Sequence, residues 1–234
     1  YLTGPLPTPG VAALVSSMRC DVGVMISASH NEYVDNGIKI FGPDGMKLSD
    51  MQELKLEELI DKDNKNLVTS EKLGRAKRID DAGGRYIEYL KSKIPFSLKL
   101  DGIKIVIDCA NGAAYKVAPT ILWELGATVY PINIDPNGTN VNKNSGSAHP
   151  EKIAQKVKSL KADIGIALDG DADRCTIVDE NGNIVNGDLI LAIISSNWKE
   201  KGKLSKKTVV GTVMSNSAFE TYLKELGISF VRTA

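Results

Sequence analysis

The chain has 234 residues, enough for one large or two modest domains with a sizeable core. Lysine plus arginine and aspartate plus glutamate both number 29, so no overall charge attracts nucleic acid or an anionic membrane surface. The apolar fraction of 42% is typical of a soluble globular protein, and no apolar run approaches the roughly 18 residues needed to span a bilayer. We therefore expect no nucleic-acid or membrane partner, and any charge-based function must be local.

Three cysteines, Cys20, Cys109 and Cys175, are too far apart for a metal-knuckle spacing and odd in number. They favour a reducing compartment, so we expect a cytoplasmic protein. The chain opens at Tyr1, in what resembles the tail of a strand, and we therefore expect a fragment. Composition leaves the oligomeric state open between monomer and homodimer.

The first part of the chain alternates between strand and helix patterns. Strand-forming runs occur at 23–26 and 38–41, and apolar residues at helical spacing predict a helix at 50–60. The many glutamates and lysines at 51–75 favour a solvated helix followed by a linker. A second helical pattern begins near Asp81 and is stopped by Pro95, in a segment that indicates a domain boundary.

Beyond that boundary the pattern becomes regular. Continuous apolar strands alternating with helices favour a parallel α/β sheet covered on both faces, and Asn181-Gly182 predicts a hairpin turn. The expected strands are 104–108, 128–133 and 163–169, and the expected helices are 114–125 and 150–162. A further helix, strand, helix and strand follow at 188–200, 208–213, 217–226 and 228–231. We predict three domains or parts of domains: 1–94, 97–186 and an incomplete 187–234.

The strongest chemical signal is the loop A-L-D-G-D-A-D-R, in which Asp169, Asp171 and Asp173 follow directly on a buried strand. Open α/β sheets bind ligands at the carboxyl ends of their strands. With neighbours about 6 Å apart and an effective dielectric constant of about 20, each like-charge pair costs about 3 kcal/mol. Arg174 alone does not offset several such repulsions, whereas a hard divalent cation such as Mg²⁺ does.

Two other interpretations of this loop stay open at this point. A solvated acidic turn would need no ion. A calcium EF-hand loop would use Asp169, Asp171, Asp173 and Glu180 at its positions 1, 3, 5 and 12. Arg174 stands where that loop needs glycine, and the surrounding pattern is β rather than helical, so we favour Mg²⁺.

A second signal is the segment I-S-A-S-H-N at 26–31, where a strand breaks into small polar residues. Ser29 beside His30 suggests a hydrolase, but no G-x-S-x-G elbow is present and His149 is the only other histidine. From the residues alone, Ser29 is an exposed hydroxyl at a strand end, where a turn or cap is the commoner role. A hydroxyl, a metal loop and Lys39 to balance charge or move a proton would nevertheless suit phosphoryl transfer.

Together these segments resemble the α-D-phosphohexomutase superfamily. The resemblance rests on I-S-A-S-H-N with D-N-G-I-K-I-F, G-P-D-G-M-K-L, D-C-A-N-G-A-A, and D-G-D-A-D-R with N-G-D, in the order of the family. It is supported by P-L-P-T-P-G-V-A-A-L, R-I-D-D-A-G-G-R-Y, A-H-P-E and F-V-R-T-A. The implied fold is a series of α/β domains, each with a mixed or parallel sheet sandwiched by helices.

The resemblance also implies a reaction and roles for residues. Ser29, rather than Ser27, would carry a phosphate that passes to a sugar phosphate. The implied substrates are glucosamine 6-phosphate and glucosamine 1-phosphate, interconverted through a bisphosphorylated sugar. Mg²⁺ would be held by the Ser29 phosphate and the three aspartates of the loop, Asp169, Asp171 and Asp173. Arg174 would contact phosphate, and His30 and Lys39 would take part in proton transfer and phosphate contact.

The chain departs from the family at some points. Glu32 stands where the family usually has proline after H-N, which places a negative charge three residues from Ser29. The T-D-G-x-R-G strand, the G-E-x-S sugar loop and the fourth-domain phosphate loop are absent from the sequence. We therefore expect part of domain 1, all of domain 2 and the start of domain 3, with little turnover by this piece alone. Mannose or glucose phosphates as substrates, and a non-catalytic metal-binding module, are the alternatives.

Overall fold

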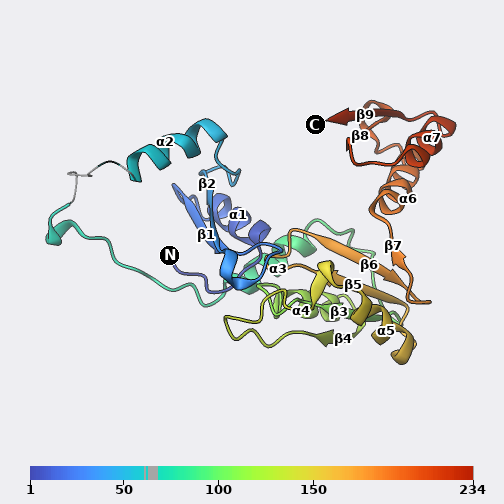
Figure 1. The fold of residues 1–234 in the computed structure, drawn as a ribbon, viewed down its shortest axis with the longest axis horizontal. Coiled ribbons are helices and arrows are strands. Elements are labelled where there is room, and N and C mark those ends of the chain that lie inside the picture. The colour runs from blue at the N-terminus through green and yellow to red at the C-terminus, as the bar shows by residue number, and fades with distance from the viewer. Residues whose placement is uncertain (61, 63–67, 234) are drawn as a thin grey trace.

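The computed structural model describes residues 1–60, 62 and 68–233, and its elements form three groups in chain order (Figure 1). The first group holds the two predicted strands, paired antiparallel so that Met25 faces Lys39. Its elements are α1 (Thr8–Ser17), β1 (Gly23–Ser27), β2 (Gly37–Phe41), α2 (Asp50–Ile60) and α3 (Ala82–Lys91). The predicted strands and both predicted helices are confirmed, with boundaries that differ from the prediction by at most three residues.

The second group is built on a five-stranded sheet with the strand order β4-β3-β5-β6-β7. Its elements are β3 (Lys104–Asp108), α4 (Val117–Glu124), β4 (Thr128–Ile132), α5 (Glu151–Leu160), β5 (Ile164–Leu168), β6 (Cys175–Asp179) and β7 (Ile184–Val185). Strands β3, β4 and β5 are parallel as predicted, and the β6–β7 hairpin adds antiparallel strands. Pro131 lies on the edge strand β4, where its missing N–H costs no ladder bond to a further strand.

Both faces of this sheet are buried. Helix α5 packs Ile153 and Val157 against Val106 and Ala167 on one face. Ile107, which points to the opposite face, is also buried. A separate apolar cluster joins the first and second groups through α1, α3 and the start of α4; its buried members are Leu6, Leu14, Ala82, Tyr86, Ile87, Ala114 and Val117. This shared core fixes the first group against the carboxyl edge of the sheet.

The third group follows β7 and stands apart from the sheet in Figure 1. It contains α6 (Gly187–Glu200), β8 (Thr208–Thr212), α7 (Ser217–Glu225) and β9 (Ser229–Thr233), with β8 and β9 paired in parallel. Its core is a small cluster around Phe219 and Leu223. Short 3₁₀ turns occupy Tyr33–Asp35, Ser70–Lys72, Gly146–Ala148 and Ser205–Lys207. Among the described residues, none of the helices combines the length and apolar character needed to cross a bilayer.

The expectation of a solvated helix at α2 is confirmed: Met51, Leu54 and Leu59 are all exposed, because this helix projects away from the rest of the chain (Figure 1). The linker expected up to residue 75 lies partly outside the described residues. One helix differs from the expectation. Helix α4 starts at Val117 rather than at 114. The residues before it form a tight turn, in which the Ala113 N–H donates to the carbonyl of Gly170.

Candidate active site

The acidic loop lies at the carboxyl end of β5, at the edge of the sheet. Asp169 and Asp171 are each 1% exposed, whereas Asp173 is exposed. One carboxylate oxygen from each of the three lies within 4.8 Å of the others. The strand therefore delivers three converging carboxylates to one point, and two of them are removed from water.

The buried carboxylates are not fully satisfied by the protein. Asp169 Oδ2 and Asp171 Oδ1 have no hydrogen-bond partner. Burial raises the pKa of Asp169 to about 6; the Arg174 N–H, 3.0 Å from its Oδ1, opposes the rise, and the charges of Asp171 and Asp173 add to it. Free carboxylate oxygens at this spacing are the donor set that a hard divalent cation prefers. The residues present thus fit a magnesium ion better than a solvated turn.

Two side chains from the first group reach the acidic loop. Lys39 of β2 places its Nζ 2.5 Å from Asp171 Oδ2 and 3.1 Å from Asp173 Oδ2. Burial lowers the pKa of Lys39, but its hydrogen bonds and charge interactions with the two aspartates outweigh this and raise it overall. The Thr8 hydroxyl also donates to Asp171 Oδ2, and the Thr8 N–H donates to the Asp171 carbonyl at 2.9 Å. The first turn of α1 is thereby fixed to the loop.

Ser29 lies just beyond β1 in a left-handed conformation, with φ of +53°. Such a conformation is strained for a residue with a Cβ and persists where the surroundings hold it. The Ser29 N–H donates to Ser27 Oγ at 2.9 Å, which gives Ser27 a structural role in the turn. A Cβ built on Gly170 would lie only 2.8 Å from the Ser29 carbonyl oxygen, so the serine loop packs directly on the acidic loop.

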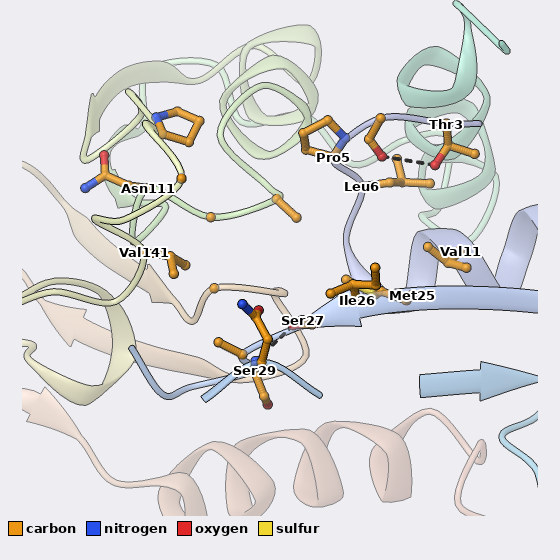
Figure 2. Close-up of a pocket in the computed structure, with 18 of the residues that line it drawn as sticks. Thr3, Pro5, Leu6, Val11, Met25, Ile26, Ser27, Ser29, Asn111 and Val141 are labelled. Atoms are coloured by element: carbon orange, nitrogen blue, oxygen red, sulfur yellow. Dashed lines mark hydrogen bonds between the residues drawn. The ribbon is translucent and has the colours of Figure 1, made fainter. Parts of the chain in front are cut away.

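A pocket of about 430 Å³ opens beside Ser29. Figure 2 shows Ser27 and Ser29 at one side, the 3–6 segment at a second side, and Asn111 and Val141 at a third. The pocket is therefore lined from both groups of elements, at the carboxyl edge of the sheet where α/β proteins bind ligands.

The other candidate residues lie as follows. His30 is exposed next to Ser29, and Arg174 is exposed next to the acidic loop. Glu180 lies in the turn of the β6–β7 hairpin, outside the acidic group, so the EF-hand interpretation is wrong. Asn111 lies in the tight turn between β3 and α4, with φ of +48°. His149 is exposed and follows the 3₁₀ turn Gly146–Ala148, and Pro150 separates it from the start of α5.

Sequence reasoning missed two residues at this site, Thr8 and Asn142. The Asn142 side chain is buried and donates to the carbonyl oxygens of Ser29 and Asn31, both at 2.7 Å. Thr8 is hidden in the segment P-L-P-T-P-G, which resembles an ordinary helix start. The sequence could have indicated Asn142 by its position in a polar loop after β4. The loop after a parallel strand lies at the same sheet edge as the acidic loop.

Three models of known protein domains match successive parts of the chain. The model of phosphoglucomutase/phosphomannomutase alpha/beta/alpha domain I matches residues 1–67, that of domain II matches residues 84–182, and that of domain III matches residues 186–234. The three models follow one another in order and together match most of the chain. The chain belongs to the phosphoglucomutase/phosphomannomutase family. The expected resemblance and the expected series of α/β domains are therefore confirmed.

Individual proteins agree with this family assignment. A phosphoglucosamine mutase from Bradyrhizobium diazoefficiens is 57% identical over 233 residues, which are 99% of this chain and 52% of that protein. The chain thus spans about half the length of the curated relatives it matches. A phosphoglucomutase/phosphomannomutase family protein from Burkholderia thailandensis has the same fold, with a TM-score of 0.75 and 24% identity over 97% of this chain and 50% of that one. The N-acetylphosphoglucosamine mutase of Aspergillus fumigatus, solved with GlcNAc-6P and magnesium, has a TM-score of 0.51 and 20% identity over 97% of this chain and 59% of that one.

The close packing at Gly170 makes a testable prediction. Gly170→Ala introduces a Cβ 2.8 Å from the Ser29 carbonyl and 2.7 Å from Val141 Cγ2, so the loops must move apart. We expect a loss of about 1–3 kcal/mol in the free energy of unfolding, measured by urea denaturation. Gly84→Ala is the control, because a Cβ at that helical position meets nothing within 4 Å. Equal stability of the two variants would contradict the packing described here.

Proposed function

We propose that the protein of which this chain forms part is a phosphoglucosamine mutase. It interconverts glucosamine 6-phosphate and glucosamine 1-phosphate, small phosphosugars, through a phosphoserine at Ser29. The observation that carries the phosphoryl-transfer chemistry is the packing of the Ser29 loop on the acidic loop, so close that a Cβ built on Gly170 would lie 2.8 Å from the Ser29 carbonyl oxygen. The choice of sugar is supported by the 57% identical relative of that name.

The proposed reaction exchanges one phosphoryl group for another. The bond between Ser29 Oγ and phosphorus breaks as the free sugar hydroxyl bonds to that phosphorus, and the hydroxyl proton passes through a base to the released Ser29 Oγ. The sugar bisphosphate then reorients. Its other phosphoryl group passes back to Ser29 Oγ, the serine proton returns to the released sugar oxygen, and the product monophosphate and the phosphoserine result. No net phosphate is consumed, as an isomerisation requires.

We propose that Mg²⁺ is the resident ion, held by Asp169, Asp171 and Asp173 together with the Ser29 phosphate. The unpartnered oxygens of Asp169 and Asp171 support this assignment. When bound, such an ion neutralises charge on a transferring phosphoryl group. The residues of the chain orient the site around it: Thr8 fixes Asp171, and the Arg174 N–H fixes Asp169.

The remaining polar side chains take the other roles. The raised pKa of Lys39 keeps this residue protonated, which supports charge balance beside Asp171 and Asp173 rather than removal of a proton. We assign proton transfer to His30, which is exposed beside Ser29, and phosphate contact to Arg174.

The domain bounds and the compartment complete the proposal. Residues 1–94 would belong to domain 1, 97–186 to domain 2 and 187–234 to domain 3. The three free thiols agree with a cytoplasmic enzyme.

Replacing the proposed phosphate carrier gives the most direct test. In the full-length protein, Ser29→Ala should lower mutase turnover more than about 1,000-fold, because no group remains to hold the phosphate. Ser27→Ala removes only the bond that Ser29 N–H donates, worth about 1 kcal/mol, so we expect a loss of no more than about tenfold. Coupled enzyme assays and intact-mass spectrometry measure both effects. Phosphate on Ser27 instead of Ser29, or activity with glucose or mannose phosphates only, would overturn the assignment.

The metal assignment makes a separate prediction. Asp171→Asn removes a buried charge from the set, and we expect the dissociation constant for Mg²⁺ to rise at least about tenfold in isothermal titration calorimetry of the full-length protein. Glu180→Gln is the control, because Glu180 lies in the hairpin turn and should not affect the ion. Circular dichroism checks that both variants fold. Unchanged Mg²⁺ affinity in a folded Asp171→Asn protein would exclude this loop as the metal site.

The departure at Glu32 can also be tested. Glu32 has φ of −70°, within the range of proline, and no described hydrogen bond is donated by its N–H. We expect Glu32→Pro to preserve or raise kcat/KM, since it stiffens the loop and removes a negative charge near the phosphate. Glu32→Ala separates the two effects, because it removes the charge alone. A large loss in the proline variant would show that the wild-type loop depends on the glutamate.

A further inference from the structure

Asn142 connects the two halves of the candidate site. It lies in the loop between β4 and α5, yet its Nδ2 donates to Ser29 and Asn31 in the loop after β1, 113 and 111 positions away along the chain. The side chain is only 5% exposed, and both donor distances are 2.7 Å. One amide group therefore holds the backbone carbonyl groups of the residues before and after His30.

The amide is itself held in place by a rigid support. The Asn142 N–H donates to the carbonyl of Ala110 at 2.9 Å, and the Ala110 N–H donates to Asp108 Oδ1 at 2.8 Å. Asp108 is fully buried at the end of β3, and its other oxygen accepts from the Gly146 N–H and from Asn133 Nδ2. The position of the Asn142 side chain is thereby tied to β3, an interior strand of the sheet.

The Ser29 loop needs hydrogen bonds of this kind to keep its conformation. Ser29 has a positive φ, and a strained conformation of this kind persists only where neighbouring groups hold it. The Ser29 carbonyl also lies against Gly170 of the acidic loop. Loss of the two hydrogen bonds from Asn142 would therefore change the position of Ser29 Oγ relative to the three carboxylates.

We propose that Asn142 is a positioning residue that holds the Ser29 loop at the distance from the acidic loop that phosphoryl transfer requires. The proposal rests on the assignment of Ser29 as phosphate carrier. It predicts an effect on the rate of the chemical step rather than on binding of the sugar, because Asn142 contacts the backbone of the carrier loop. A small displacement of a reacting group is sufficient to slow a reaction strongly.

The chain offers a matched set of variants for the full-length protein. Asn142→Gly removes the amide while keeping the backbone at φ of +58°, which glycine adopts freely. Asn142→Asp keeps the volume but replaces the donors with a carboxylate oxygen facing two carbonyls. Asn144→Gly is the control, because Asn144 lies in the same loop at φ of +49° and is exposed.

We expect Asn142→Gly and Asn142→Asp to lower kcat at least about tenfold with KM changed less than about twofold, and Asn144→Gly to do neither. Hydrogen exchange of a peptide spanning residues 27–33 should rise in both Asn142 variants and stay at the wild-type rate in the control. A kcat within about twofold of the control, or unchanged exchange, would overturn the proposal. If the wild-type protein carries no phosphate on Ser29 and has no mutase activity, the proposed function fails; the exchange experiment then still reports whether Asn142 holds the loop.

Discussion

Repulsion among three carboxylates at the end of one strand is the constraint on which the rest of this site depends. Asp169 and Asp171 are almost completely buried, where like charges interact strongly. This repulsion is reduced by two groups from distant segments, the ammonium of Lys39 and the hydroxyl of Thr8. The backbone N–H of Arg174, in the loop itself, also donates to Asp169. Two of the buried oxygens, Asp169 Oδ2 and Asp171 Oδ1, still have no hydrogen-bond partner, and this supports the proposal of a divalent cation at the site.

This arrangement couples the first group of elements to the second. The pairing of Lys39 and Thr8 with the acidic loop requires β2 and the start of α1 to stand at the edge of the five-stranded sheet. The shared apolar cluster of α1, α3 and α4 provides that placement, and Gly170 allows the serine loop to approach closely. Polar contacts at the site and apolar packing behind it thus support the same orientation.

Much of the fold follows from local patterns. Continuous apolar runs identify β3 and β5, and the turn at Asn181-Gly182 marks the hairpin, because these signals lie within a few residues of one another. The late start of α4 could not be obtained in this way. The turn before α4 is set by a bond to Gly170 more than 50 residues later.

The sequence by itself determined the alternation of strands and helices, the acidic loop at a strand end and the hydroxyl at Ser29. Each of these is encoded by residues close together in the chain, and the family resemblance added the link between them. Only the tertiary structure decided that Lys39 and Thr8 pair with Asp171 and that Asn142 holds the Ser29 loop. These contacts join residues more than 100 positions apart, and their geometry depends on how the first group packs against the sheet, which no local pattern specifies.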